Sequence, residues 1–448
     1  MQTTTKNNDW YLKSFEVLEK SLNGESKSPI HAIRKNALAR FMELGFPSTH
    51  NEEWRFTNIA SIRDTRFDPT LQLTDKEFSK EKVDSLFVTD SKGIKLVFVN
   101  GHYSAVLSNN RSARKKVKVG SLASALRSGD PTVHQYLSRY ASIENNAFVA
   151  LNTAFVQDGT FLQIEDGVSL DEPVECLYVT VSSGRPLISN PRNLFVVGKN
   201  CRATIVESYA ALDESDCLDN VVSEIVVGDN SVVEHDKLEV EGANAYHIGT
   251  IQIHQSAGSN YTNNVISLGG KIVRNTITVV LADERAESTL NGLSLGTGEQ
   301  LIDSHTTIDH TMPNCTSHEL YKAILDGKAR GVFNGKIFVR QDAQKTDAKQ
   351  TNKTLLLSDD ATINTKPQLE IFADDVKCTH GAAVGQLDEE QVFYLRSRGF
   401  SERSARDILT FAFASDVVER VHSDSLREKL RGLIQRRLED GRSSRGQA

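Results

Sequence analysis

A strand–turn–strand pattern recurs through residues 151–385 and constrains the fold more than any other feature of the sequence. Its copies are VVGKNCRATIVE (196–207), VVGDNSVVEHDK (226–237), VLADERAESTLN (280–291), LLSDDATINTKP (356–367) and, more loosely, IQIHQSAGSNYTNNVI (251–266). Each copy joins a pair of apolar residues to an alternating strand through a short turn of small or polar residues. Consecutive copies begin about 25–30 residues apart, a spacing typical of stacked solenoid repeats.

The repeat predicts a parallel β-helix core over residues 151–387. One turn cannot bury its inward side alone, whereas stacked turns share a continuous core. A β-sandwich is the alternative, because short strands at regular spacing also suit that architecture. We favour the solenoid, since a stretch of this length without helical periodicity is long for one sandwich.

Helical patterns flank the core. Residues 1–150 read as a mixed, partly helical domain, in which Ser28 and Pro29 start a helix that runs to Leu44. Residues 388–448 read as a C-terminal helical domain, with Ser401 capping its second helix.

Composition and charge narrow the function classes. The chain has 448 residues, 39% of them hydrophobic and 25% charged, as in soluble globular proteins. A net charge of −7 does not favour nucleic acid or membrane surfaces as partners. The N-terminal MQTTTKNNDW lacks the features of a secretion signal, and the five cysteines form no CxxC pair. We therefore expect a cytoplasmic protein with reduced thiols.

The sequence lacks the motifs of familiar enzymes, including a Walker A loop, GxGxxG, GxSxG and HExxH. The densest group of potential metal ligands is His305, His310, Cys315 and His318, whose spacing matches no established zinc pattern. We interpret these side chains as part of the solvated outer face of the solenoid.

Acidic residues in the same region leave a second function open. Asp303 and Asp309 would serve as the paired surface carboxylates of a stand-alone β-helix enzyme acting on polysaccharide. The lack of a secretion signal counts against this alternative.

The segment VKCTHG (376–381) contains the other candidate ligands. Side chains two residues apart on a strand share a face, so Cys378 and His380 are predicted to project together. A thiolate and an imidazole are good ligands for iron or zinc, but two ligands do not complete a four-coordinate site. Two interpretations remain: ordinary packing, or half of a site shared across a subunit interface.

Three segments carry a resemblance to a known family: NEEWRFTNI (51–59), DGKARGVFNGKIFVRQDAQKTDAKQTNKTLLLSDDA (326–361) and IFADDVKCTHGAAVGQLDEEQVFYLRSRG (371–399). With the helices that follow, they resemble the SufB/SufD family of iron–sulfur cluster assembly proteins. The resemblance implies a mainly β fold, in which a right-handed parallel β-helix core is flanked by the two partly or wholly helical domains described above.

The resemblance also implies a role and partners. The chain would be a non-catalytic scaffold subunit of the SUF complex, working with SufB and the SufC ATPase. Its C-terminal helices, about residues 388–440, would dock SufC, and its last solenoid turns would pair with SufB. A transient iron–sulfur cluster, shared with SufB, would form there and support iron acquisition. A flavin bound through the complex is left open.

Within the family, CTHGA is the SufD form of the motif, and Ala361 lies near the position where SufB carries its cluster-binding cysteine. The resemblance assigns His380 as a metal ligand, while Cys378 either lines the same interface or remains a buried thiol. An unpaired solenoid edge would also allow the isolated chain to form a homodimer.

Overall fold

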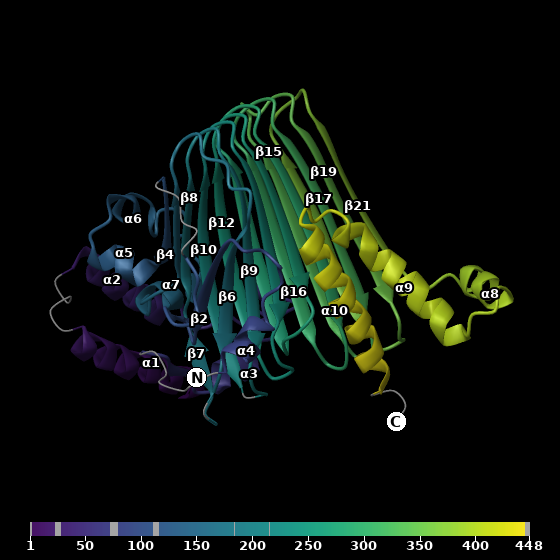
Figure 1. The fold of residues 1–448 in the computed structure, drawn as a ribbon, viewed down its shortest axis with the longest axis horizontal. Coiled ribbons are helices and arrows are strands. Elements are labelled where there is room, and N and C mark those ends of the chain that lie inside the picture. Colours follow the sequence, from purple (N-terminus) through teal and green to yellow (C-terminus); the bar gives the residue numbers. More distant parts are fainter. Residues whose placement is uncertain are drawn as a thin grey trace.

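The core of the computed structural model is a solenoid of two facing β-sheets (Figure 1). The structure describes residues 2–22, 28–71, 79–110, 116–182, 184–214 and 216–443. From β8 onward the chain alternates between the sheets, and each strand pairs in parallel with the strand one full turn earlier. The predicted parallel β-helix is confirmed, and the sandwich alternative is wrong.

One sheet, called sheet A, has 11 strands, nine of them in the order β20-β18-β16-β14-β12-β10-β8-β5-β4, with β1 and β7 off this path. Its strands are β1 (Asp68–Pro69), β4 (Val117–Ser121), β5 (Thr160–Ile164), β7 (Leu187–Ser189), β8 (Arg192–Val197), β10 (Cys217–Val227), β12 (Tyr246–Gln255), β14 (Ile272–Leu281), β16 (Leu301–His310), β18 (Arg330–Val339) and β20 (Thr362–Ile371).

The other sheet, called sheet B, has 10 strands in the order β21-β19-β17-β15-β13-β11-β9-β6-β2-β3. Its strands are β2 (Ile94–Val99), β3 (His102–Tyr103), β6 (Val174–Thr180), β9 (Arg202–Ala211), β11 (Val232–Val240), β13 (Asn260–Ser267), β15 (Glu287–Gly296), β17 (Thr316–Leu325), β19 (Asp347–Leu356) and β21 (Lys377–Gly385).

The corners that lead from sheet A to sheet B explain the repeat. From the β8–β9 corner to the β18–β19 corner, each contains one residue with a left-handed backbone, and these residues recur 27 to 31 positions apart at Asn200, Asn230, Gly258, Arg285, Asn314 and Lys345. Asn and Gly adopt this conformation most readily. The residue that follows each of them is small and buried, as Cys201 and Cys315 are. The stacked corners therefore form an ordered edge of the solenoid.

One of the sequence repeats belongs to the opposite edge. Segment 356–367 joins β19 to β20 and so leads from sheet B to sheet A, whereas segments 196–207, 226–237 and 280–291 lead from sheet A to sheet B. Both edges need an apolar strand end, a tight turn and a new strand. Local sequence alone therefore does not distinguish them.

The space between the sheets is mostly apolar. Side chains from successive turns, such as Ile251, Ile277 and Ile308, stack in one buried cluster with Tyr261 and Phe333. Burial of each such side chain stabilises the fold by about 1.5–3 kcal/mol. This shared core is what makes the single turns cooperative.

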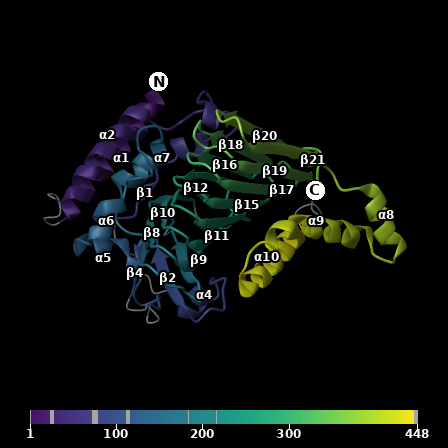
Figure 2. The same cartoon turned by 90° about the horizontal axis from the view of Figure 1, so that it is seen from above.

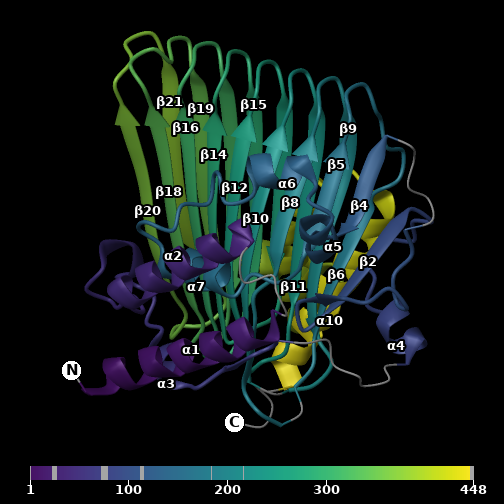
Figure 3. The ribbon, with the colours of Figure 1, turned by 90° about the vertical axis from the view of Figure 1, so that its left-hand side faces the viewer.

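N-terminal helices cover the outer face of sheet A (Figure 3). They are α1 (Gln2–Ser21), α2 (Pro29–Leu44), α3 (Ala60–Asp64), α5 (Leu122–Arg127), α6 (Pro131–Tyr136) and α7 (Ala147–Ala154), together with the short 3₁₀ helix η2 (Glu52–Trp54). Helix α4 (Lys80–Asp84) packs instead against β2 and β6 of sheet B. The predicted helix from Pro29 to Leu44 is confirmed, and its C-terminal cap is Gly45, with φ +62°. Phe41 and Phe148 pack with Leu301 and Val332, so the N-terminal region shares a core with the solenoid.

The C-terminal helices are α8 (Glu389–Ser397), α9 (Glu402–Val418) and α10 (Asp424–Ser443). The predicted cap at Ser401 is confirmed, since its side chain accepts from Ser404 N–H, and Asp388 caps α8 by accepting from Glu390 N–H. The end of α9 and the length of α10 pack on the outer face of sheet B, whereas α8 projects away from the solenoid (Figure 2). Within the described residues, no helix is both long and apolar enough to span a bilayer.

Candidate functional site

The end of the solenoid formed by β20 and β21 is open. Each of these strands pairs with another strand of its sheet on one side only, and their side chains are half-buried or exposed throughout. Large apolar side chains are uncovered there, with Ile371, Phe372 and Val384 exposed by 39%, 59% and 48%. Unpaired edge strands with apolar side chains are typical of surfaces that receive another chain.

Cys378 and His380 both lie on β21 at this open end. They pair in register with Ala348 and Gln350 of β19. Cys378 packs against a cluster that contains Ile337 and Ala348, so this face of β21 is the inner face of the solenoid. The predicted common face is confirmed. No further solenoid turn follows β21, so no strand covers the inner face of β21 at this end of the solenoid.

The two side chains differ in exposure. His380 is exposed, and Cys378 is half-buried. Burial raises the pKa of the Cys378 thiol. Among the described residues, no three His, Cys, Asp or Glu side chains gather as a metal site. An iron ion bound by this pair would take its remaining ligands from elsewhere.

Polar side chains lie behind His380 on the two preceding turns, and sequence reasoning missed them. Gln350 and Glu319 occupy the same column as His380, on β19 and β17. Both are buried, and Gln350 Nε2 donates to Glu319 Oε2 at 2.5 Å. Positions 319, 350 and 380 are one repeat apart, so counting back by the repeat length from His380 would have found them.

The residues from His305 to His318 do not form a metal site. His305 and His310 lie on opposite faces of β16, because their positions differ by five, an odd number. His310 is buried inside the solenoid beside Ser317 Oγ at 2.9 Å, and the buried Cys315 thiol donates to the Asp283 carbonyl. The solvated-surface interpretation is therefore wrong for His305, His310 and Cys315, while His318 is half-buried.

The carboxylate pair of the polysaccharide-enzyme alternative is also absent from the surface. Asp303 is fully buried and paired with Arg274, and it lies 3.0 Å from His305 Nε2. Burial opposes its ionisation, but the charges of Arg274 and His305 lower the pKa of Asp303 to about 2. Such a carboxyl cannot act as a general acid near neutral pH. Asp309 instead forms an ion pair with Arg340 at 2.7 Å.

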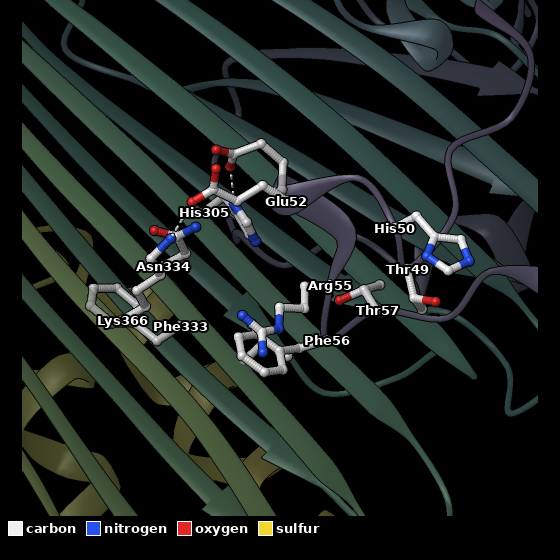
Figure 4. Close-up of a pocket in the computed structure, with 12 residues that line it drawn as sticks. Thr49, His50, Glu52, Arg55, Phe56, Thr57, His305, Phe333, Asn334 and Lys366 are labelled. Atoms are coloured by element: carbon white, nitrogen blue, oxygen red, sulfur yellow. Dashed lines mark hydrogen bonds and ion pairs between the residues drawn. The ribbon is translucent and has the colours of Figure 1, made fainter.

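The NEEWRFTNI segment holds the N-terminal region against this network. Thr57 donates to Asp303, the Trp54 ring lies 3.9 Å from the Arg274 guanidinium, and Glu53 lies 3.3 Å from His305. A cavity of about 420 Å³ is lined both by this segment and by residues of β16, β18 and β20 (Figure 4). Glu52 crosses one side of it to reach Lys366 of β20 at 2.7 Å.

A second exposed apolar surface lies on the projecting helices. Phe393 and Tyr394 of α8 are 71% and 57% exposed, and with Ile408 and Leu409 of α9 they line a groove of about 1060 Å³. Phe411, which the sequence places on the same helix, is half-buried and packs against the solenoid cluster instead. We call the surface of Phe393, Tyr394, Ile408 and Leu409 the α8–α9 surface.

Comparison with known proteins agrees with this architecture. The protein-family model described as "SUF system FeS cluster assembly, SufBD core domain" matches residues 179–413. A second family model, of the SufBD protein N-terminal region, matches residues 5–176. The chain belongs to the SufBD family. It is thus a component of the SUF system for iron–sulfur cluster assembly, and this membership implies SufB and SufC as partners.

Individual relatives match over most of their length. The chain is 32% identical to the iron–sulfur cluster assembly SufBD family protein slr0076 of Synechocystis, covering 92% of each chain. It is 29% identical to SufD of Escherichia coli, over 90% of this chain and 92% of that protein. It is 26% identical to SufD of Bacillus subtilis, over 96% and 97% of the two chains.

Proposed function

We propose that this chain is the SufD-type scaffold subunit of a SUF complex and that His380 offers an imidazole ligand to a nascent cluster at the interface with SufB. The observation that carries the proposal is the exposed position of His380 on β21, at the uncovered end of the solenoid. The likeness to two proteins named SufD and the CTHGA motif favour SufD over SufB. The subunit itself would be non-catalytic, with ATP hydrolysed by SufC.

The proposal gives each domain a task. Residues 1–150 would brace the solenoid, residues 151–387 would carry the cluster interface, and residues 388–448 would dock SufC. The α8–α9 surface supports the docking role, because it is apolar, exposed and bordered by the acidic residues Glu389 and Glu390. The cluster is cargo built at the interface, with the missing ligands supplied by SufB.

The central test is His380→Ala in a complex co-expressed with SufB and SufC. We expect the complex to assemble normally, while its iron and acid-labile sulfide fall by about tenfold or more, because an interface ligand is lost. His134→Ala is the matched control, since His134 is an exposed histidine on α6. Normal iron and sulfide in the His380→Ala complex would overturn the assignment.

Cys378→Ser in the same assay separates the two roles of the thiol. Serine keeps the size of the side chain but binds iron poorly. Retained iron and sulfide would identify Cys378 as a packing residue, consistent with its half-buried position against Ala348. A loss that matches His380→Ala would make it a second ligand.

A further inference from the structure

The inner face of β19 carries an amide that is held in one orientation beside His380. Gln350 is 2% exposed, and its Nε2 donates to Glu319 Oε2 on β17 at 2.5 Å. Because the nitrogen is committed to β17, the amide cannot flip without losing this bond. Its oxygen Oε1 is buried and has no hydrogen-bond partner among the described residues.

A glycine on the opposite sheet makes room for this amide. A Cβ atom on Gly335 of β18 would lie 2.4 Å from Gln350 Nε2 and 2.8 Å from its Cδ. The amide is therefore confined between Gly335 and Glu319. Buried acceptors without partners are rare in proteins, so the unpaired oxygen is available to a donor on the neighbouring strand β21, which lies at the open end.

We propose that Gln350 is a positioning residue that accepts a hydrogen bond from the His380 ring. The two residues are register partners on neighbouring parallel strands and share the inner face, and β21 lies on the side of Gln350 opposite Glu319. This inference rests on the proposed function of His380. The bond leaves one ring nitrogen as N–H toward Oε1 and the other nitrogen unprotonated and directed away from β19, free to bind iron.

The consequence is a fixed tautomer. Histidine ligands in metal sites ordinarily donate their second N–H to a protein acceptor, and loss of that acceptor lowers metal affinity about 10–100-fold. Gln350 performs this task with an uncharged amide. Glu319 in turn orients the amide, and its side chain does not touch the ligand.

The test compares four variants of the full-length chain. Gln350→Leu removes the acceptor. Gly335→Ala keeps the glutamine in the sequence, but its added methyl group would push the Gln350 amide out of position. Glu319→Gln keeps an acceptor for Gln350 Nε2. Gly331→Ala is the matched control, because its added Cβ would meet Leu325 and Ile363 on the same inner face, away from Gln350.

The first measurement is the tautomer of His380 in the isolated chain, from ¹⁵N chemical shifts of histidine-labelled protein at pH 8, assigned by comparison with His380→Ala. We expect a single tautomer in the wild type, Glu319→Gln and Gly331→Ala, and a mixture in Gln350→Leu and Gly335→Ala. A wild-type tautomer ratio in folded Gln350→Leu overturns the proposal, and thermal unfolding of each variant reports whether it is folded.

The second measurement is the iron content of the complex with SufB and SufC. We expect about a tenfold loss in Gln350→Leu, and iron near the wild-type level in Glu319→Gln. The two proposals fail separately. Normal iron in His380→Ala would remove the proposed ligand role, whereas the tautomer measurement tests the Gln350 contact whether or not a cluster forms.

Discussion

Charged side chains occupy part of the solenoid interior. Lys237 is 1% exposed, and its Nζ contacts Glu239 at 2.8 Å and His247 Nε2 at 2.8 Å. Burial opposes ionisation of Glu239, but Lys237 and His247 lower the pKa of its carboxyl to about 2. The absence of a side chain at Gly249 leaves space for Lys237 Nζ, which a Cβ there would approach to 2.5 Å. Removing one partner of a buried ion pair destabilises a protein by about 3–5 kcal/mol. The stability of the fold therefore depends on Lys237, Glu239 and His247 being present together.

Glu319 makes stability depend on pH. Burial raises the pKa of its carboxyl from 4.5 to about 7. Between these two values the folded protein keeps a proton that the unfolded chain has released, so stability falls as pH rises and the loss is complete above the folded-state pKa. At 1.36 kcal/mol per pKa unit, the loss is on the order of 3 kcal/mol.

Glu319→Gln should therefore flatten the pH dependence of the free energy of unfolding. Urea unfolding at pH 4.5 and at pH 8 measures this, and we expect the variant to lose about 3 kcal/mol less than the wild type between them. Glu428→Gln, on the exposed face of α10, is the control. Equal slopes in the Glu319→Gln variant and the wild type would show that Glu319 is ionised in the folded protein.

Among the elements, α8 stands out because it shares so little surface with the solenoid. Only Val392 of its nine residues is buried, whereas α9 buries Ala414, Val417 and Val418 against sheet B. The α8–α9 surface thus exposes apolar area that the fold does not use. Lys322 of β17 donates to the Phe413 carbonyl and to the Asp416 carboxylate at the end of α9. These bonds hold the end of α9 on the solenoid, while α8 projects away from it.

The paired change Phe393→Ala and Ile408→Ala should weaken SufC binding at least about tenfold, because central apolar anchors carry most of the affinity of an interface. Isothermal titration of SufC into the variant measures the affinity, and ATPase stimulation provides a second readout. Val106→Ala, an 86% exposed apolar side chain elsewhere, is the control. Unchanged affinity would exclude the α8–α9 surface as the docking site.

The molecule as a whole is asymmetric. Antiparallel strands β3 and β4 stand at one end of the two sheets, next to the N-terminal region, whereas β20 and β21 leave the other end open. A solenoid ordinarily needs a polar cap at each end to remain soluble. An open end with Phe372 and Val384 exposed is consistent with a partner subunit in the complex or a second copy in its absence.

Val384→Lys should therefore shift the isolated chain from dimer toward monomer and weaken SufB binding as well, because a charge on an open edge opposes strand addition. Sedimentation velocity at micromolar concentration measures the first effect. Val106→Lys supplies a matched charge at an unrelated surface. A wild-type chain that is monomeric under these conditions would contradict self-association through this end.

Local sequence determined the elements. The cap at Ser401, the helix from Pro29 to Leu44 and the common face of Cys378 and His380 all depend on residues within one or two turns of chain, and all are found as predicted. The repeat period fixed the solenoid for the same reason, since each turn carries its own corner residues.

Only the tertiary structure decided which side chains from different turns of the solenoid lie next to one another. The burial of Asp303 depends on a segment 246 residues earlier in the chain, whose Thr57 reaches across to it. The contact of Gln350 with Glu319 depends on how many residues each corner adds, and the corners differ in length. A strand's alternation specifies which side chains share a face but not which turn lies above it, so stacking alone brought Gly335, Gln350 and Glu319 together beside His380.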